Sequence, residues 1–240
     1  MIRRCDGSNE PRLDIARPET TEMIIEVLKA DSFGRVELIE KEGLRQVRRV
    51  ACGGRIPGSA LAARFLARRE QVILQRLAHV PALPRALGAD GEGNFHRSYV
   101  EGAPLYEANA LDGAYFDQLF ELVQSIHDAG VTHNDLAKEA NILVTPGCKP
   151  ALVDFQIATR FPPRCGPLRR RLFAMLRRED RRHLLKQKRV HRPDLLTPAE
   201  LVALERKSLP VRVWSATLMK PYQRILCRFG LEVARGPHGR

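Results

Sequence analysis

The stretch His133-Asn134-Asp135-Leu136-Ala137-Lys138-Glu139-Ala140-Asn141 decides the fold of this chain, together with Asp154-Phe155, which begins thirteen residues beyond Asn141. Two short apolar runs, residues 142–144 and 151–153, lie between Asn141 and Asp154 and are separated by Pro146-Gly147. Adjacent proline and glycine favour a turn, so the two runs predict a β-hairpin. A hairpin here would bring Asn141 and Asp154 to the same end of a cleft.

The polar residues of this stretch meet the requirements of phosphoryl transfer. That reaction needs a metal ion to neutralise phosphate charge and a carboxylate to orient the acceptor hydroxyl. Oxygen ligands such as those of Asn141 and Asp154 suit magnesium, which keeps water and phosphate oxygens as its other ligands. Taken singly, each residue has an ordinary alternative, because Asp and Asn are common in turns. Their combination in this order favours the chemical interpretation.

The motif His133-x-Asp135-Leu136…Asn141 resembles the catalytic loop of protein kinases, and Asp154-Phe155-Gln156 resembles their metal-binding element. The resemblance implies that Asp135 is the catalytic base and that His133 supports the loop. It also implies that Asn141 and Asp154 bind Mg²⁺, and that ATP is the phosphoryl donor.

Two positions depart from the family pattern. Asn141 lies six residues beyond Asp135, where five is usual, so the loop carries an extra residue. Gln156 replaces a glycine, which removes backbone freedom and predicts a less switchable site.

Three positions upstream resemble the phosphate-binding parts of the family more weakly. Gly34 matches one glycine of the glycine-rich loop, whereas Lys29 and Asp31 replace the other two, and a simple β-turn is the alternative. Arg49 stands where the family has a strand lysine, although its planar fork is a different group from an ammonium. Glu70 stands at the position of the ion-pairing glutamate. The alternatives are an exposed strand charge for Arg49 and a solvated acid for Glu70.

The segment Tyr99-Val100-Glu101-Gly102 resembles the hinge between kinase lobes. The resemblance implies that backbone groups near Ser98 and Val100 bind adenine. His127, which precedes the catalytic loop, is interpreted as a packing residue.

The rest of the chain predicts an α+β protein. Apolar runs within residues 23–50 predict two or three antiparallel strands, and residues 53–58 a loop. Helices are predicted over residues 61–77, where Leu61, Phe65, Leu66, Val72, Ile73 and Leu77 form the apolar face, and over 115–126, which Gly130 would cap. A strand is predicted at 96–100. Thr197-Pro198-Ala199-Glu200 predicts another helix start.

This order predicts a two-lobed protein-kinase-like fold with a truncated C-terminal lobe. We expect a flexible leader at 1–20, an N-lobe with a small sheet and one helix at 21–100, and a reduced C-lobe with a basic helical region at 101–240. No activation loop or Ala-Pro-Glu element is visible after Arg160. In this the chain resembles RIO-type kinases and bacterial lipopolysaccharide-core kinases.

Composition limits the cellular setting. No run of about 18 apolar residues and no secretory leader occurs, and five cysteines are scattered without a CxxC pair, so we expect a cytoplasmic protein. The net charge of +12 attracts polyanions such as nucleotides or anionic lipid. A nucleic-acid partner is disfavoured, because the basic residues lack interleaved aromatics.

The basic C-terminal third carries an apolar stripe within residues 168–189: Leu168, Leu172, Phe173, Leu176, Leu184 and Leu185. Such a helix either contacts an anionic membrane, at its inner face, or a phosphorylated sugar, or else it packs onto the lobe. Glu179-Asp180 interrupts the basic run and is expected to pair with Arg182 or His183.

The leading functional hypothesis is a small bacterial serine/threonine kinase that phosphorylates a hydroxyl group. One alternative is a lipopolysaccharide or sugar kinase that acts on a membrane glycolipid, which an arginine-lined cleft in front of Asp135 would favour. The other is a pseudokinase that serves as a binding module, which Arg49 and the depleted glycine loop favour.

Overall fold

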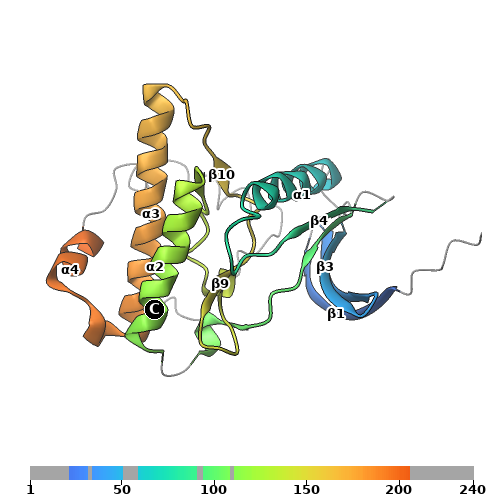
Figure 1. Ribbon diagram of the computed structural model, residues 1–240, viewed down its shortest axis with the longest axis horizontal. Coiled ribbons are helices and arrows are strands. Elements are labelled where there is room, and N and C mark those ends of the chain that lie inside the picture. Colours follow the sequence, from blue (N-terminus) through green and yellow to red (C-terminus); the bar gives the residue numbers. More distant parts are fainter. Residues whose placement is uncertain (1–21, 32–33, 51–58, 91–93, 109–110, 206–240) are drawn as a thin grey trace, which may run out of the picture.

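The computed structural model describes residues 22–31, 34–50, 59–90, 94–108 and 111–205. A curved sheet with one helix forms one lobe, and a mainly helical lobe lies beside it (Figure 1). The leader at 1–20 and the loop at 53–58 fall outside the described residues. The fold is thus the two-lobed α+β arrangement that the sequence predicts.

The first lobe contains a five-stranded antiparallel sheet in the order β1-β2-β3-β5-β4. Its strands are β1 (Glu22–Asp31), β2 (Gly34–Lys41), β3 (Leu44–Val50), β4 (Ala86–Ala89) and β5 (Phe95–Ser98). Glu42 and Gly43 both have positive φ and form the two-residue turn between β2 and β3, a geometry that suits the twist of a hairpin. The three N-terminal strands and β5 are confirmed. β4 was not predicted, because its four residues include Gly88 at φ +105.

The helix predicted over 61–77 is confirmed as α1 (Ser59–Arg76), but its predicted buried face is confirmed only at Ile73 and Leu77. Leu61, Phe65 and Val72 are 72%, 64% and 41% exposed. The buried positions are Ala63, Ala67, Glu70, Ile73, Leu74 and Leu77. Because this stripe includes two alanines and a glutamate, the spacing of large apolar residues does not indicate it.

The second lobe contains α2 (Gly113–Asp128), α3 (Pro167–His191) and α4 (Pro198–Glu205) in the part of the chain that is described. α2 and α3 pack side by side (Figure 1). The predicted hairpin is confirmed as β8 (Ile142–Val144) and β9 (Pro150–Leu152), joined by β6 (Ala103–Pro104). β7 (Val131–Thr132), just before the catalytic loop, pairs with β10 (Thr159–Arg160), which follows Phe155.

Local signals at helix ends are confirmed. Thr197 and Glu200 exchange hydrogen bonds at the start of α4, with Thr197 N–H donating to Glu200 Oε2 at 2.8 Å. Gly130 follows α2 at φ +76, and a Cβ there would lie 2.7 Å from the carbonyl oxygen of Phe161. Only glycine therefore fits at the end of α2.

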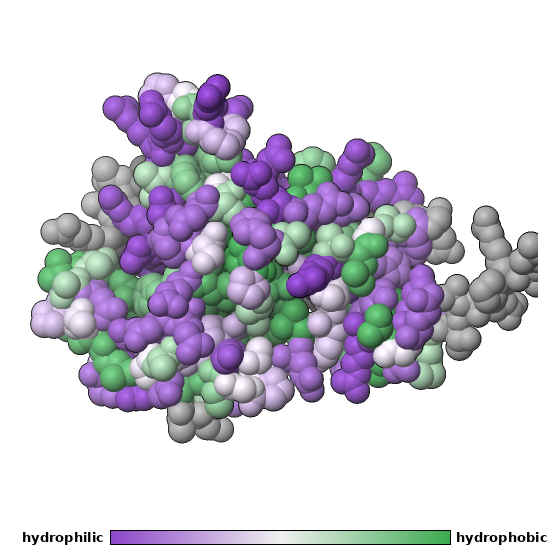
Figure 2. Space-filling view, viewed as in Figure 1, coloured by the Kyte–Doolittle hydropathy of each residue, from purple (hydrophilic) through white to green (hydrophobic). Residues whose placement is uncertain are grey.

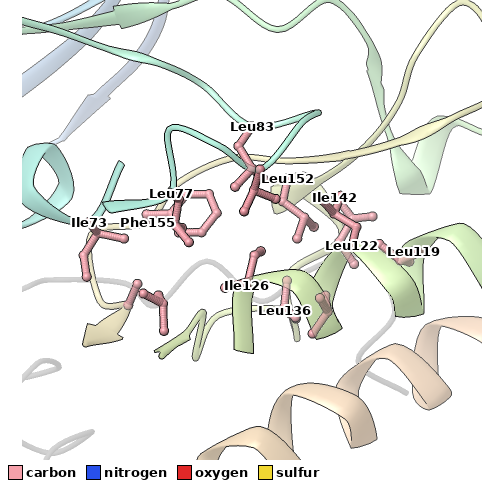
Figure 3. Close-up of a cluster of buried hydrophobic side chains, with 14 of the residues drawn as sticks. Ile73, Leu77, Leu83, Leu119, Leu122, Ile126, Leu136, Ile142, Leu152 and Phe155 are labelled. Carbon is pink, nitrogen blue, oxygen red and sulfur yellow. The ribbon is translucent and has the colours of Figure 1, made fainter. Parts of the chain in front are cut away.

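One hydrophobic core joins the two lobes. It contains the C-terminal half of α1, the inner face of α2, the hairpin β8–β9 and Phe155 (Figure 3). Phe155 is fully buried, and Figure 3 shows its ring beside Leu77. Because this core includes residues next to Asp154 and residues of α1, it fixes α1 relative to the catalytic loop.

Candidate active site

Asp135 lies in the loop between β7 and β8 with its side chain 15% exposed. Asn141 Nδ2 donates to both the carbonyl oxygen and Oδ2 of Asp135, each at 3.0 Å. Lys138 Nζ donates to the same Oδ2 at 2.6 Å. Asp135 Oδ1 receives no hydrogen bond from the described residues, so it is available to an acceptor hydroxyl. Residues Glu139–Asn141 form a 3₁₀ helix, which accommodates the six-residue spacing.

The hairpin places Asn141 next to Asp154, as the sequence predicts. Ile142 pairs with Leu152, and Val153 N–H donates to the carbonyl oxygen of Asn141 at 3.0 Å. Asp154 has φ +64, a left-handed conformation that aspartate tolerates better than most residues. Because Asn141 Nδ2 is committed to Asp135, its Oδ1 is the atom left for a cation. An amide oxygen and a carboxylate fit the hard-oxygen preference of magnesium.

His133 holds the loop as a neutral side chain. It is fully buried, and burial lowers its pKa against the opposing effects of Asp180, Asp154 and Asp135. Its Nε2–H donates to the Val153 carbonyl at 3.0 Å, and its Nδ1 accepts from Asp135 N–H at 3.3 Å. Its ring lies 4.6 Å from that of Phe155. His133 therefore connects Asp135 to the residue before Asp154 as a neutral imidazole, protonated only at Nε2.

The lowered pKa of His133 predicts a loss of stability in acid. The unfolded chain takes up a proton near the ordinary pKa of about 6.5, whereas folded His133 resists it, so stability is present above that pH and falls below it. Urea unfolding at successive pH values should give a slope that is shallower in His133→Gln by at most about 1.4 kcal/mol per pH unit. The two slopes should coincide above neutral pH. Equal slopes in acid would contradict the assignment.

Asp180 is a site residue that the sequence analysis placed wrongly. It is 1% exposed, and its carboxylate accepts from the backbone N–H groups of His133 and Asn134, each at 2.9 Å. It also accepts from His127 Nε2 at 3.0 Å, so His127 is a buried hydrogen-bonded residue. Only the neighbouring acid behaves as expected, since Glu179 lies 3.6 Å from Arg182. In the sequence, Asp180 stands out as an acid within a basic helix. The spacing of residues along that helix does not indicate that its partners lie in a distant loop.

Helix α3 supports the catalytic loop beyond Asp180. Gln187 Nε2 donates to the carbonyl oxygens of Leu136 and Ala137 at 3.2 Å each. His191 lies 3.5 Å from Glu139. Three residues spread over about three turns of one helix therefore contact the loop that carries Asp135.

Arg49 and Glu70 form a buried ion pair between β3 and α1. Arg49 Nη1 donates to Glu70 Oε2 at 3.1 Å, and their side chains are 12% and 1% exposed. The alternatives of an exposed strand charge and a solvated acid are therefore excluded. Arg69, next to Glu70, donates to the Ala158 carbonyl at 2.8 and 2.9 Å and to Thr159 Oγ1 at 3.2 Å. α1 thus binds both the sheet and the segment that follows Asp154-Phe155.

The sheet presents an apolar surface on the same side as Arg49. Val36 pairs with Arg49, and the next pair along is Leu38 with Val47, so these side chains share a face. Gly34 opens β2 at φ +143 and pairs with Asp31, while residues 32–33 are outside the described range. This face therefore holds the Arg49 guanidinium beside the apolar side chains of Val36, Leu38 and Val47.

The predicted hinge residues lie at and beyond the end of β5. Ser98 N–H donates to the Arg85 carbonyl at 2.9 Å, and Tyr99 N–H donates to the Arg45 carbonyl at 3.3 Å. Val100 N–H donates to no other described residue. Of the two predicted positions, Val100 is therefore the one with an available donor.

The first half of α3 is a basic exposed surface. Leu168 and Leu172 are 79% and 41% exposed, whereas the Phe173 ring packs 4.8 Å from that of Phe161 and Leu184 and Leu185 are buried, so the predicted stripe is exposed at its N-terminal end and packs beyond it. Figure 2 shows the projecting end of α3 as mainly hydrophilic. A groove of about 900 Å³ between α2, α3 and α4 is lined by Arg177, Arg178, Arg181 and Arg182, among others, and by none of residues 133–141. No helix within the described ranges is long and apolar enough to cross a membrane.

Comparisons with known proteins agree with this geometry. No protein-family model matches the chain. Serine/threonine-protein kinase chk-1 of Caenorhabditis briggsae is 32% identical over 107 residues, which are 39% of this chain and 22% of that protein. The match thus spans about a fifth of the length of this curated relative.

Solved structures give a broader match. The Rio2 kinase-ADP/Mg²⁺-phosphoaspartate complex from Chaetomium thermophilum superimposes with a TM-score of 0.55 at 15% identity, over 86% of this chain and 69% of that one. Another structure of Rio2 kinase from the same organism gives 0.53 at 16%, over 77% and 61%. The chain therefore has a protein-kinase-like fold, as its catalytic-loop motif predicts.

Proposed function

We propose that this chain transfers the γ-phosphoryl group of ATP to a hydroxyl group, with serine or threonine in a protein as the leading acceptor. The observation that carries the proposal is the position of Asn141. Its amide donates to Asp135, while its backbone accepts from Val153 next to Asp154. One residue thus joins a carboxylate suited to orient an acceptor and a carboxylate suited to bind metal.

Each residue then has a defined role. Asp135 orients the acceptor hydroxyl and accepts its proton through Oδ1. Lys138, on the opposite oxygen of Asp135, is 64% exposed and adds positive charge beside the transferred group. Arg49, held by Glu70, binds phosphate oxygens, and Val100 with the end of β5 binds adenine. Gly34 lets the β1–β2 turn approach the phosphates.

Magnesium is the metal that the donor set fits. Asn141 Oδ1 and the Asp154 carboxylate would hold it, with phosphate oxygens and water as the other ligands. When bound, the ion would neutralise charge on the phosphates during transfer. Rio2 kinase, whose fold this chain shares, has been solved with ADP and Mg²⁺.

Loss of the proposed metal ligand gives the direct test. Asp154→Asn should reduce transfer of label from [γ-³²P]ATP to lysate protein by at least about a hundredfold, because the charge on the phosphates is no longer neutralised. Excess Mg²⁺ should restore part of it. Asp128→Asn, an exposed aspartate at the end of α2, is the matched control and should keep full activity. If wild type transfers no label to any acceptor, the chain is a binding module instead.

A glycolipid hydroxyl is the second candidate acceptor. The exposed half of α3, with Leu168, Leu172 and Arg169-Arg170-Arg171, has the charge and apolar side chains that bind an anionic membrane surface. A cytoplasmic enzyme with this surface would act at the inner face of the membrane. Label that enters a lipid-sugar extract and no protein fraction would favour this acceptor. The arginine-lined groove gives it less support, because it does not include Asp135.

A further inference from the structure

Glu70 is shared by two arginines from neighbouring strands. Arg49 of β3 contacts its Oε2 at 3.1 Å, and Arg97 of β5 lies 3.3 Å from its Oε1. Both arginine side chains are 12% exposed, and Glu70 is 1% exposed. The ion pair proposed for nucleotide binding is therefore a cluster of three charged groups.

The strand register places both arginines on one face of the sheet. Arg97 pairs with Val47, and Arg49 pairs with Phe95 two positions along, so their side chains leave β5 and β3 on the same side. This is the face that also carries Val36 and Val47 and that packs against α1. Arg97 thus belongs to the surface assigned above to the nucleotide.

The cluster carries one more positive charge than negative. Arginine keeps its charge in proteins, so two guanidinium groups face a single carboxylate. Arg97 Nη1 is buried and makes no hydrogen bond with a described residue, since its contact with Glu70 lacks hydrogen-bond geometry. A buried cation without a full partner is costly, and an anionic ligand would relieve that cost.

We propose that Arg97 is a second phosphate-binding residue that acts beside Arg49 on the polyphosphate chain of ATP. This rests on the proposed function and goes beyond it, because it assigns phosphate recognition to two arginines held by one glutamate. The Glu70 carboxylate neutralises one of the two positive charges, and the phosphates neutralise the other. Recognition in this protein then depends more on the number of phosphates than on the base.

Nucleotide titration of the full chain tests the proposal. In Arg97→Met the Kd for Mg²⁺-ATP should rise about tenfold or more, the effect of losing a charge-assisted hydrogen bond. The Kd for adenosine should change less than about twofold, because adenosine has no phosphate. Arg97→Lys should keep most of the ATP affinity, since the charge remains. Arg45→Met, an exposed arginine of β3, is the control and should bind both ligands like wild type.

The outcomes separate this inference from the proposed function. Equal weakening of ATP and adenosine, or unchanged ATP binding, would show that Arg97 is only structural. Wild type that binds ATP and transfers phosphate while Arg97→Met also binds normally would overturn this inference alone. Wild type that fails to bind ATP would overturn both. If Arg97→Met does not fold, Arg97→Gln should show the same selective loss of ATP affinity, because it keeps polarity without charge.

Discussion

Asp135→Asn should reduce kcat for phosphoryl transfer by about a thousandfold and leave the Kd for ATP within about twofold of wild type. An amide oxygen in place of the carboxylate can still accept from Asn141 Nδ2 and Lys138 Nζ, which both contact Oδ2. The loop geometry is therefore retained. What the variant loses is a negatively charged oxygen able to accept the proton of the acceptor hydroxyl. The loss should appear in kcat, with little change in binding.

Single-turnover transfer and ATP titration on the same preparation measure the two quantities. Asp128→Asn, which makes the same chemical change at an exposed site, should match wild type in both. An Asp135→Asn protein with unchanged kcat would exclude Asp135 as the base. A variant that loses ATP affinity in proportion to kcat would instead indicate that Asp135 acts in nucleotide binding.

The local parts of the site could be predicted from the sequence. Residues 133–141 and Asp154 form a motif that lies within a short stretch of sequence. The apolar runs and the Pro-Gly turn between them predict the hairpin. Short-range spacing is enough to bring Asn141 beside Asp154, because only the five residues 145–149 separate β8 from β9. The capping box at Thr197 and the glycine after α2 could likewise be predicted, because each depends only on neighbouring residues.

The long-range parts could not be predicted in this way. Asp180 contacts residues 46 and 47 positions earlier, and no periodicity within α3 indicates that partner. Arg97 meets Glu70 only because β5 pairs with β3, which sequence reasoning did not establish. Part of the buried face of α1 was missed for a related reason: Glu70 is buried with its two ion pairs, so the core stripe looks polar in the sequence.

The departures from the kinase pattern have structural counterparts. The 3₁₀ turn at Glu139–Asn141 accommodates the extra loop residue and still directs the Asn141 amide to Asp135. Arg49 forms the ion pair expected of a lysine, and the planar guanidinium leaves further donors for phosphate. The Asn141–Asp135 contact favours a catalytic interpretation, because it orients the proposed base, whereas the Arg49–Glu70 pair serves nucleotide binding and fits a binding module equally well.

Asp180→Ala should lower the free energy of unfolding by about 3–5 kcal/mol, because two buried donors and one partly buried donor lose their common acceptor. The donors are the N–H groups of His133 and Asn134 and Nε2–H of His127. Asn134 sits at φ +68, a conformation that needs such support. The loop should therefore loosen in the folded protein, and kcat should fall about a hundredfold at a temperature where the variant is folded.

Glu179→Ala is the matched control, since Glu179 is the adjacent buried acid, contacts Arg182 and does not contact the catalytic loop. It should change stability by less than about 1 kcal/mol and leave kcat intact. Amide hydrogen exchange distinguishes a local effect from global destabilisation: in Asp180→Ala, exchange at His133 and Asn134 should accelerate more than at the core amides of α2. If both sets accelerate equally and kcat per folded molecule is unchanged, Asp180 stabilises the fold but does not position the loop. If protection at His133 and Asn134 is lost first and kcat falls with it, the contact between α3 and the loop is what holds Asp135 in place for transfer.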